Sequence, residues 1–175
     1  KEGFEITVIS FAWDPGKACA INTLTCTKES LAVIHKFLES TTRKAAHNGY
    51  FDKGCIEEKW GIKVNRFYVD TMLFHYILDE NRSGGEERTL KGEYTLKKFV
   101  HDFIPEFGDY EKEVAHFFKK GEGDKIPEKD LLHYAAIDSD VTRQIVYKQF
   151  RLLFGLDLDS PKTELKKMLD TVNFS

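Results

Sequence analysis

The sequence lacks the features that mark a membrane protein or a secreted, disulfide-linked protein. No apolar run approaches the ~18 residues needed to span a bilayer, and the start, Lys1-Glu2-Gly3-Phe4-Glu5, lacks the basic-then-apolar layout of a signal peptide. The three cysteines, an odd number, show no CxxC or Cys/His spacing, which argues against a disulfide frame or a zinc site. We therefore expect an intracellular protein (cytoplasmic or nucleoid, or in the host cell if viral) with no membrane partner.

Two kinds of functional site are also missing. There is no Gly-rich phosphate loop and no convincing nucleophile–base pair, so a small-molecule α/β enzyme is disfavoured. The net charge is −3, so the chain has no overall basic excess for binding nucleic acid. This argues against a high-affinity duplex binder. It does not argue against a nuclease that grips a few nucleotides, because metal-binding carboxylates themselves add negative charge.

The length and the order of the predicted elements indicate one mixed α/β domain. The 175 residues, 41% of them hydrophobic, can fill a single core. The apolar run TVISFAW at 7–13 predicts a strand buried on both faces, and the turn residues at 14–17 lead into a returning strand at 18–21. Another short strand is predicted at 43–47. Strands that come early and helices that come late favour the α/β class.

Helices are predicted where apolar residues recur at helical spacing and where cap residues flank them. Thr27 can cap a helix in which Leu31, Ile34 and Leu38 share one face. The remaining predicted helices cover about 51–60 with Gly61 as a left-handed end, 72–78 behind the cap residues Asp70 and Thr71, 95–104 before Pro105, 111–119 and about 130–154. We expect a surface loop at 79–93 and a connector from Gly155 with a further helix at 162–171.

One carboxylate interrupts the apolar face of the predicted last helix. Leu131, Tyr134, Asp138, Val141 and Ile145 are spaced at three and four residues, so they share one face. An unpaired carboxylate there is costly unless a cation or strong hydrogen-bond donors compensate it. Tyr134 lies one turn earlier, so its hydroxyl can reach the same place. Helix geometry alone leaves equally open that Asp138 lies at the edge of the face, solvated or capping.

A second carboxylate, Asp52, ends the segment HNGYFD at 47–52, at the start of a predicted helix. The helix dipole favours carboxylates there, so a plain N-terminal charge is the alternative reading. His47 and Asn48 can make hydrogen bonds that fix a sharp strand-to-helix turn. No second histidine lies at ligand spacing, which argues against His47 as a metal ligand. Two distant carboxylates, Asp52 and Asp138, suit divalent metal ions, and these ions suit phosphodiester hydrolysis.

Taken together, these segments resemble a specific family. HNGYFD resembles the second motif, and YAAID at 134–138 the tyrosine-containing third motif, of DEDD-type 3′–5′ exonucleases, in particular the proofreading domain of family-A DNA polymerases. The similarity extends through DTML at 70–73 and TLKKF at 95–99, in the expected order. It implies a ribonuclease-H-like fold, a mixed sheet flanked by helices, over residues 1–154. Residues 155–175 would form a connector towards a polymerase domain.

The resemblance also implies roles for individual residues in a site with two divalent ions, Mg or Mn, acting on the 3′ end of single-stranded DNA. Asp138 would bind the metal that activates water, Tyr134 would orient that water, and Asp52 would bind the second metal directly or through water. Asn48 would brace the turn or touch the terminal nucleotide, and Phe51 would pack near the 3′ end. The lysines of KKGEGDK are either phosphate contacts or a solvated charge run: Lys119, Lys120 and Lys125.

The chain departs from the family pattern at its start. The family's first motif is Asp-x-Glu on the strand that precedes 7–13, whereas Phe4-Glu5-Ile6-Thr7 has one carboxylate and no Asp two residues before it. We expect that the first strand is absent, that the chain starts downstream of this motif, and that the 175-residue polypeptide has little or no exonuclease activity. Two alternatives stay open: an RNA-trimming exonuclease resembling ribonuclease D, and a non-catalytic, exonuclease-like nucleic-acid-binding domain.

Overall fold

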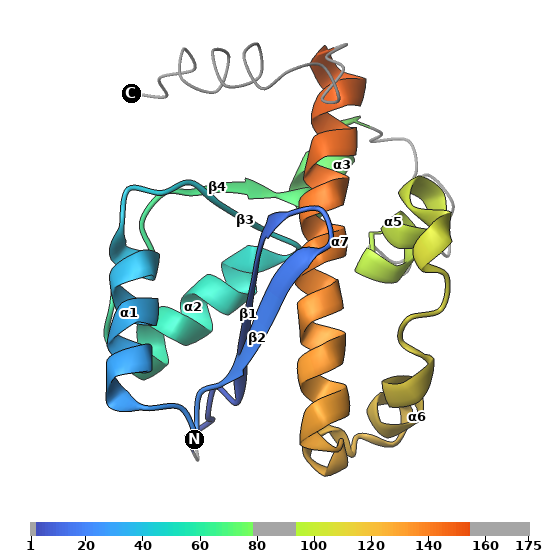
Figure 1. Cartoon of the computed structure of the whole chain (residues 1–175). Coiled ribbons are helices and arrows are strands. Elements are labelled where there is room, and N and C mark those ends of the chain that lie inside the picture. Colours follow the sequence, from blue (N-terminus) through green and yellow to red (C-terminus); the bar gives the residue numbers. More distant parts are fainter. Residues whose placement is uncertain (1–2, 79–93, 155–175) are drawn as a thin grey trace.

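The computed structural model describes residues 3–78 and 94–154, and it contains the predicted hairpin at the start (Figure 1). Strand β1 (Val8–Asp14) pairs antiparallel with β2 (Lys17–Asn22), and Val8 lies opposite Asn22. The turn between them contains Gly16 at φ +72°, a conformation that costs glycine little. The prediction of a strand, a turn and a returning strand is therefore confirmed.

A second pair of strands is parallel. Strand β3 (Lys44–Ala46) lies beside β4 (Phe67–Asp70), with Ala46 opposite Asp70. The sequence predicted β3 but not β4, which is only four residues long. Among residues 3–78 and 94–154 the four strands form two separate two-stranded sheets. The mixed α/β class is thus confirmed, with the antiparallel and parallel pairs in different sheets.

The predicted helices are present, with small shifts at their ends. The Thr27 hydroxyl accepts a hydrogen bond from the Ser30 N–H at 3.1 Å, and Gly61 ends its helix at φ +66°, as their positions predicted. The predicted loop at 79–93 and helix at 162–171 lie outside the described residues. The described α-helices are α1 (Lys28–Glu39), α2 (Gly49–Trp60), α3 (Thr71–Leu78), α5 (Leu96–Phe103), α6 (Lys112–Lys120) and α7 (Glu128–Phe154), with short 3-10 turns at Pro105–Phe107 and Gly123–Lys125.

Helix α7 organises the fold. In Figure 1 it runs through the molecule with the β1–β2 hairpin, α1 and α2 on one side and α5 and α6 on the other. It contacts both strands of the hairpin, β3, α3, α5 and α6. The main core lies between α5 and α7 and consists of Tyr94, Phe99, Val100, Ile104, Val141 and Ile145. Helix α7 therefore carries both Asp138 and two residues of this core, Val141 and Ile145. No helix in the described part of the chain is long and apolar enough to cross a membrane.

The prediction that the first strand is buried on both faces is wrong. No residue of β1 is fully buried, and Trp13 is 56% exposed. The reason is that the strand lines an open cleft instead of lying between packed layers.

Candidate active site

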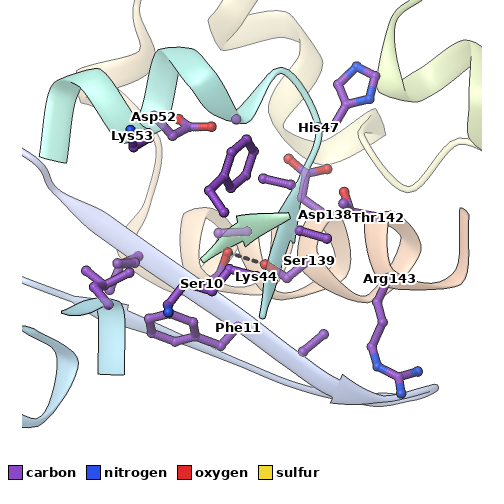
Figure 2. Close-up of a pocket in the computed structure, with 18 of the residues that line it drawn as sticks. Ser10, Phe11, Lys44, His47, Asp52, Lys53, Asp138, Ser139, Thr142 and Arg143 are labelled. Atoms are coloured by element: carbon purple, nitrogen blue, oxygen red, sulfur yellow. Dashed lines mark hydrogen bonds between the residues drawn. The ribbon is translucent and has the colours of Figure 1, made fainter. Parts of the chain in front are cut away.

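A cleft of about 1120 Å³ contains most of the residues that the sequence singled out. Most of its lining comes from β1, β2, β3, α1, α2 and α7, with single residues from β4 and α5. Asn48, Phe51 and Asp52 line it from the start of α2, and Tyr134 and Asp138 line it from α7. Figure 2 shows Asp52 on α2, separate from Asp138 on α7. The two distant motifs therefore meet in one cleft, as the nuclease prediction requires.

The predicted phosphate-binding lysines lie elsewhere. Lys119 and Lys120 are in the last turn of α6 and are not among the residues that line the cleft. Lys119 borders a separate pocket of about 320 Å³. Lys125 forms an ion pair with Glu122 at 2.8 Å. Their role in phosphate binding stays a prediction.

The turn from β3 into α2 is fixed through the backbone of Asn48. This residue has φ 53° and ψ 33°, the left-handed region that asparagine tolerates better than most residues. Its side chain makes no cap hydrogen bond, in contrast to our expectation. Its N–H instead donates to Oδ1 of Asp70 at 3.0 Å. Asp70 also accepts the Met72 N–H at 3.0 Å, which confirms the predicted cap of α3.

Gly49 allows α2 to start close to the parallel strand pair. A Cβ atom at this position would lie 2.5 Å from the Cβ of Ala46 and 2.6 Å from the ring of Phe67. Only glycine fits this approach without a shift of its neighbours. The HNG sequence thus places the first turn of α2, and with it Asp52, directly against β3 and β4.

His47 holds the same turn against α3. Its Nδ1 is 2.9 Å from the Thr71 hydroxyl, and its ring packs edge-on against Phe99 with 5.3 Å between ring centroids. Burial lowers the pKa of His47 to about 4, although the charge of Asp70 and a hydrogen bond to the Tyr94 backbone act in the opposite direction. The ring is therefore neutral at physiological pH, and its contacts are structural.

Two tyrosine hydroxyls converge on Asp138. Tyr110 donates to Oδ1 of Asp138 at 2.5 Å, and Tyr134 hydrogen-bonds to the same carboxylate. The two rings are stacked, with centroids 5.9 Å apart and an interplanar angle of 16°. Tyr134 was predicted to reach this place, but Tyr110 was missed. No local pattern indicates Tyr110, because it comes from the segment before α6, 28 residues from its partner.

Both aspartates of the cleft are shifted towards the protonated form. Burial raises the pKa of Asp138 to about 6, and the hydrogen bonds from the two tyrosines offset part of this effect. Partial desolvation raises the pKa of Asp52 to about 6, and the negative charge of Asp70 adds to the rise. Each carboxylate is therefore short of positive charge, a condition that a bound cation would relieve.

Two carboxylates fit one divalent ion better than a complete two-ion site. Mg²⁺ is often held by one or two carboxylates together with substrate phosphates and water, which Asp52 and Asp138 can match. Within residues 3–78 and 94–154 no group of three or more Asp, Glu, His or Cys side chains is placed to hold a metal. The site thus has a partial set of ligands.

The comparison with known proteins gives an independent assignment. A family model described as 3′–5′ exonuclease matches residues 3–153. A search of curated proteins gave no match. The matched range includes both motifs and every wall of the cleft.

Proposed function

Because this chain belongs to the 3′–5′ exonuclease family, we propose that it binds the 3′ end of single-stranded DNA and hydrolyses the terminal phosphodiester with divalent metal ions. The observation that supports this most is the meeting of Asp52, Tyr134 and Asp138 in one cleft. The same proposal places the domain inside the cell, as the proofreading module of a linked DNA polymerase.

Asp52 and Asp138 would hold the ions, Mg or Mn, each through a carboxylate that a cation would keep ionised at neutral pH. When bound, such ions lower the pKa of an attacking water and stabilise the leaving 3′ oxygen. We infer that the cleft admits the terminal nucleotide between these two aspartates.

Tyr134 would position the attacking water and would not take its proton. Burial and the neighbouring Asp138 raise the pKa of Tyr134 far above neutral, so the hydroxyl stays protonated. A protonated hydroxyl beside Asp138 can donate to the carboxylate and accept from a water at the same time. A change of Tyr134 to Phe would remove this positioning and leave the carboxylates in place.

Phe51 would contact the terminal base. Its side chain is 67% exposed and lies at the rim of the cleft, one residue before Asp52. Stacking of a base on an exposed aromatic ring contributes about 1–3 kcal/mol and is tolerant of sequence. Asn48 would brace the turn, and Lys119 and Lys120 would contact phosphates further along the strand.

We expect slow hydrolysis, because the described residues provide only two carboxylates for two ions. The partial ligand set also favours a second candidate function, a non-catalytic domain that binds single strands. In that case the binding of a 3′ end would not depend on metal, and Asp138→Ala would leave the affinity unchanged.

The test is digestion of a 5′-labelled single-stranded DNA oligonucleotide at high protein concentration with Mn²⁺ or Mg²⁺. A ladder that shortens from the 3′ end, lost in Asp138→Asn and retained in the exposed control Asp109→Asn, supports the proposal. Equal ladders from wild type and Asp138→Asn would show a contaminating nuclease and overturn it. No ladder, together with metal-independent strand binding, selects the non-catalytic function.

The same assay with an RNA oligonucleotide of matched sequence separates DNA proofreading from RNA trimming. Faster shortening of DNA supports the proposed substrate. Faster shortening of RNA would overturn it in favour of an activity like that of ribonuclease D.

A further inference from the structure

Phe118 is a large apolar residue at the surface beside the cleft. It lies in the last turn of α6 and is 48% exposed. Its ring contacts the ring of Tyr134, with centroids 5.5 Å apart and an interplanar angle of 55°. Tyr134 lines the cleft and hydrogen-bonds to Asp138, whereas Phe118 is not among the lining residues. Phe118 therefore lies just outside the cleft, next to the tyrosine of the proposed active site.

Phe118 extends an aromatic cluster that begins at Asp138. Tyr134 contacts Phe118 and also stacks on Tyr110, with 5.9 Å between the two tyrosine ring centroids. Both tyrosine hydroxyls bond to the Asp138 carboxylate, whereas Phe118 has no polar side-chain atom and offers a ligand only its ring. A lone exposed aromatic residue is common on protein surfaces. What distinguishes Phe118 is its place beside Tyr134 and beside cationic side chains.

Lysines lie close to the exposed ring. Lys119 is the next residue of α6, and it forms no ion pair with any residue that the structure describes. The short turn at Gly123 also approaches the ring, since a Cβ atom there would lie 3.8 Å from it. Lys125 ends the same turn and pairs with Glu122 at 2.8 Å. Lys119 is therefore the cation beside Phe118 whose charge is left for a ligand.

The pocket of about 320 Å³ between α5 and α6 continues this cationic surface. Lys97 and Lys112 border it and are held by ion pairs with Glu111 at 3.5 Å and with Asp109 at 3.2 Å. Lys119 borders the pocket and directly follows Phe118 in the chain. The full lining is Lys97, Asp109, Lys112, Ala115, His116 and Lys119. Three lysines thus face one aspartate, which suits an anionic group.

An exposed ring beside unpaired positive charge fits an unpaired nucleotide. Proteins that bind single strands stack the bases on aromatic side chains and place cations along the backbone. Duplex DNA keeps the faces of its bases inside the stack, so it could use the lysines but not the ring. An apolar peptide side chain could use the ring but not the lysines. A single strand of nucleic acid uses both.

The order of these groups assigns the ring to one nucleotide. In the proposed function the terminal base contacts Phe51 and the scissile phosphate lies at Asp138 and Tyr134. The second nucleotide lies on the other side of that phosphate. Figure 1 shows α2, which carries Phe51, and α6, which carries Phe118, on opposite sides of α7. The second base can therefore reach Phe118 from Tyr134, and the phosphates that follow can reach Lys119.

We propose that Phe118 is a stacking platform for the second base from the 3′ end of a bound single strand, and that the phosphates on the 5′ side of this base pass Lys119 towards the pocket between α5 and α6. This inference rests on the proposed function and adds to it a path by which the strand leaves the cleft. Phe118 is a binding residue, because it does not touch the reacting atoms.

The experiment measures the binding of a 5′-labelled oligothymidine of about ten nucleotides by fluorescence anisotropy, with Mg²⁺ and again with a chelator. A second oligonucleotide has an abasic sugar at the second position from the 3′ end. We expect Phe118→Ala to weaken binding of the intact strand at least about fivefold and binding of the abasic strand less than twofold. Equal weakening of both strands would overturn the proposal. A denaturing gel checks that the strands stay intact.

Matched variants separate stacking from packing. Phe118→Leu keeps an apolar side chain against Tyr134 but has no ring, so it should weaken binding as Phe118→Ala does, whereas Phe118→Trp should bind within about twofold of wild type. Tyr76→Ala removes a 45% exposed aromatic residue from α3, near the other end of α7, and should bind like wild type. If Phe118→Ala fails to fold by circular dichroism, Phe118→Leu takes its place. Full affinity in Phe118→Leu would overturn the proposal.

The salt dependence of binding tests the path of the phosphates. Lys119→Gln should lower the slope of log affinity against log salt concentration by about 0.7, the effect of one lost phosphate contact on a single strand. Phe118→Ala should leave this slope unchanged, because stacking releases no counterions. Lys36→Gln, in the last turn of α1, is the control for the loss of a surface charge. Equal slopes for the two lysine variants would overturn the assignment of Lys119.

The same samples separate this inference from the proposed function. A wild-type protein that binds strands, with no difference between Phe118→Ala and wild type, would overturn the platform alone and leave the exonuclease to its own assay. A wild-type protein that binds no strand, with or without Mg²⁺, would overturn both.

Discussion

The carboxylate of Asp70 fixes the backbone of Asn48, which lies 22 residues earlier in the chain. Oδ1 of Asp70 accepts the Asn48 N–H at 3.0 Å, and the same oxygen accepts the Met72 N–H at 3.0 Å. Asp70 is only 7% exposed. One buried carboxylate therefore holds the turn before α2 and the first turn of α3 together. Asp52 lies one turn into α2, so its position depends on the turn that Asp70 holds, and the charge of Asp70 also raises the pKa of Asp52.

Replacement of Asp70 by Ala should lower the free energy of unfolding by about 2–3 kcal/mol, because two part-buried backbone N–H groups lose their carboxylate acceptor. Urea denaturation monitored by circular dichroism measures this. The control is Asp109→Ala, since the Asp109 side chain is 56% exposed and forms a surface ion pair with Lys112; it should change stability by less than about 0.5 kcal/mol. Equal effects of the two variants would contradict the role of Asp70.

A pair of glycines in α2 tests the close approach of this helix to the strands. Gly49→Ala should destabilise the protein by about 1–3 kcal/mol, because the added methyl group would overlap Ala46 and Phe67. Gly54→Ala adds the same group to the same helix where no atom lies within 4 Å, and it should stabilise by up to about 1 kcal/mol. Thermal unfolding of both variants gives the answer. We expect the two changes in stability to have opposite signs. Destabilisation by Gly54→Ala would refute the close approach of Gly49 to the strands as the cause.

The sequence predicted local elements well because their signals are local. Thr27 and Gly61 end helices through their own side-chain or backbone properties, and the turn at Gly16 follows from the residues around it. Both carboxylates of the cleft were also identified, since Asp138 breaks an apolar helix face. These features need no information from distant parts of the chain.

The contacts that the sequence did not predict join distant segments. Tyr110 reaches Asp138 across 28 residues, and the Asp140 carboxylate accepts the Gly16 N–H across 124 residues at 3.0 Å. The local sequence around each of these residues gives no indication of its partner. The prediction that β1 is buried on both faces was wrong for a related reason. An apolar run shows that a strand can be buried, but only the packing of the whole chain shows whether the strand lines a cleft.

The raised pKa of Asp138 predicts a dependence of stability on pH. The folded pKa of about 6 lies above the ordinary value of 3.8, so between these pH values the folded protein binds more protons than the unfolded chain. The free energy of unfolding should therefore fall as the pH rises from about 4 to 6 and then level off. Asp138→Asn removes this loss and should be more stable than wild type by about 1–2 kcal/mol at pH 7.5.

The two proteins should have nearly equal stability at pH 4, where Asp138 of the wild type is largely protonated. Urea denaturation at the two pH values measures the difference, and Asp109→Asn is the control for the loss of a surface charge. A gain from Asp138→Asn that is the same at both pH values would contradict the argument, because it would not come from ionisation.

Binding of divalent ions should offset the loss of stability that the ionised carboxylates of Asp52 and Asp138 cause. An ion that binds the folded protein alone adds about 1.4 kcal/mol of stability at roughly ten times its dissociation constant. We expect Mn²⁺ or Mg²⁺ to raise the melting temperature of wild type at pH 7.5 and to have little effect on Asp138→Asn or Asp52→Asn. The baseline is the melting temperature in buffer from which a chelator has removed divalent ions. If the ions still raise the melting temperature of a variant that combines Asp52→Asn and Asp138→Asn, they bind at another site.

The hydrogen bond from Tyr110 to Asp138 makes the last prediction. This bond stabilises the ionised carboxylate, so Tyr110→Phe should raise the pKa of Asp138 further above 6. Tyr134→Phe should act in the same direction, because its hydroxyl bonds to the same carboxylate. Tyr50→Phe removes the hydroxyl of a tyrosine that is 60% exposed and should leave the carboxylate unchanged. The carboxyl carbon shift of Asp138, followed by NMR as a function of pH, measures the pKa in each variant. If Tyr110→Phe titrates like wild type while Tyr134→Phe does not, Tyr110 packs beside the site without controlling its charge, and Tyr134 alone sets the ionisation of Asp138.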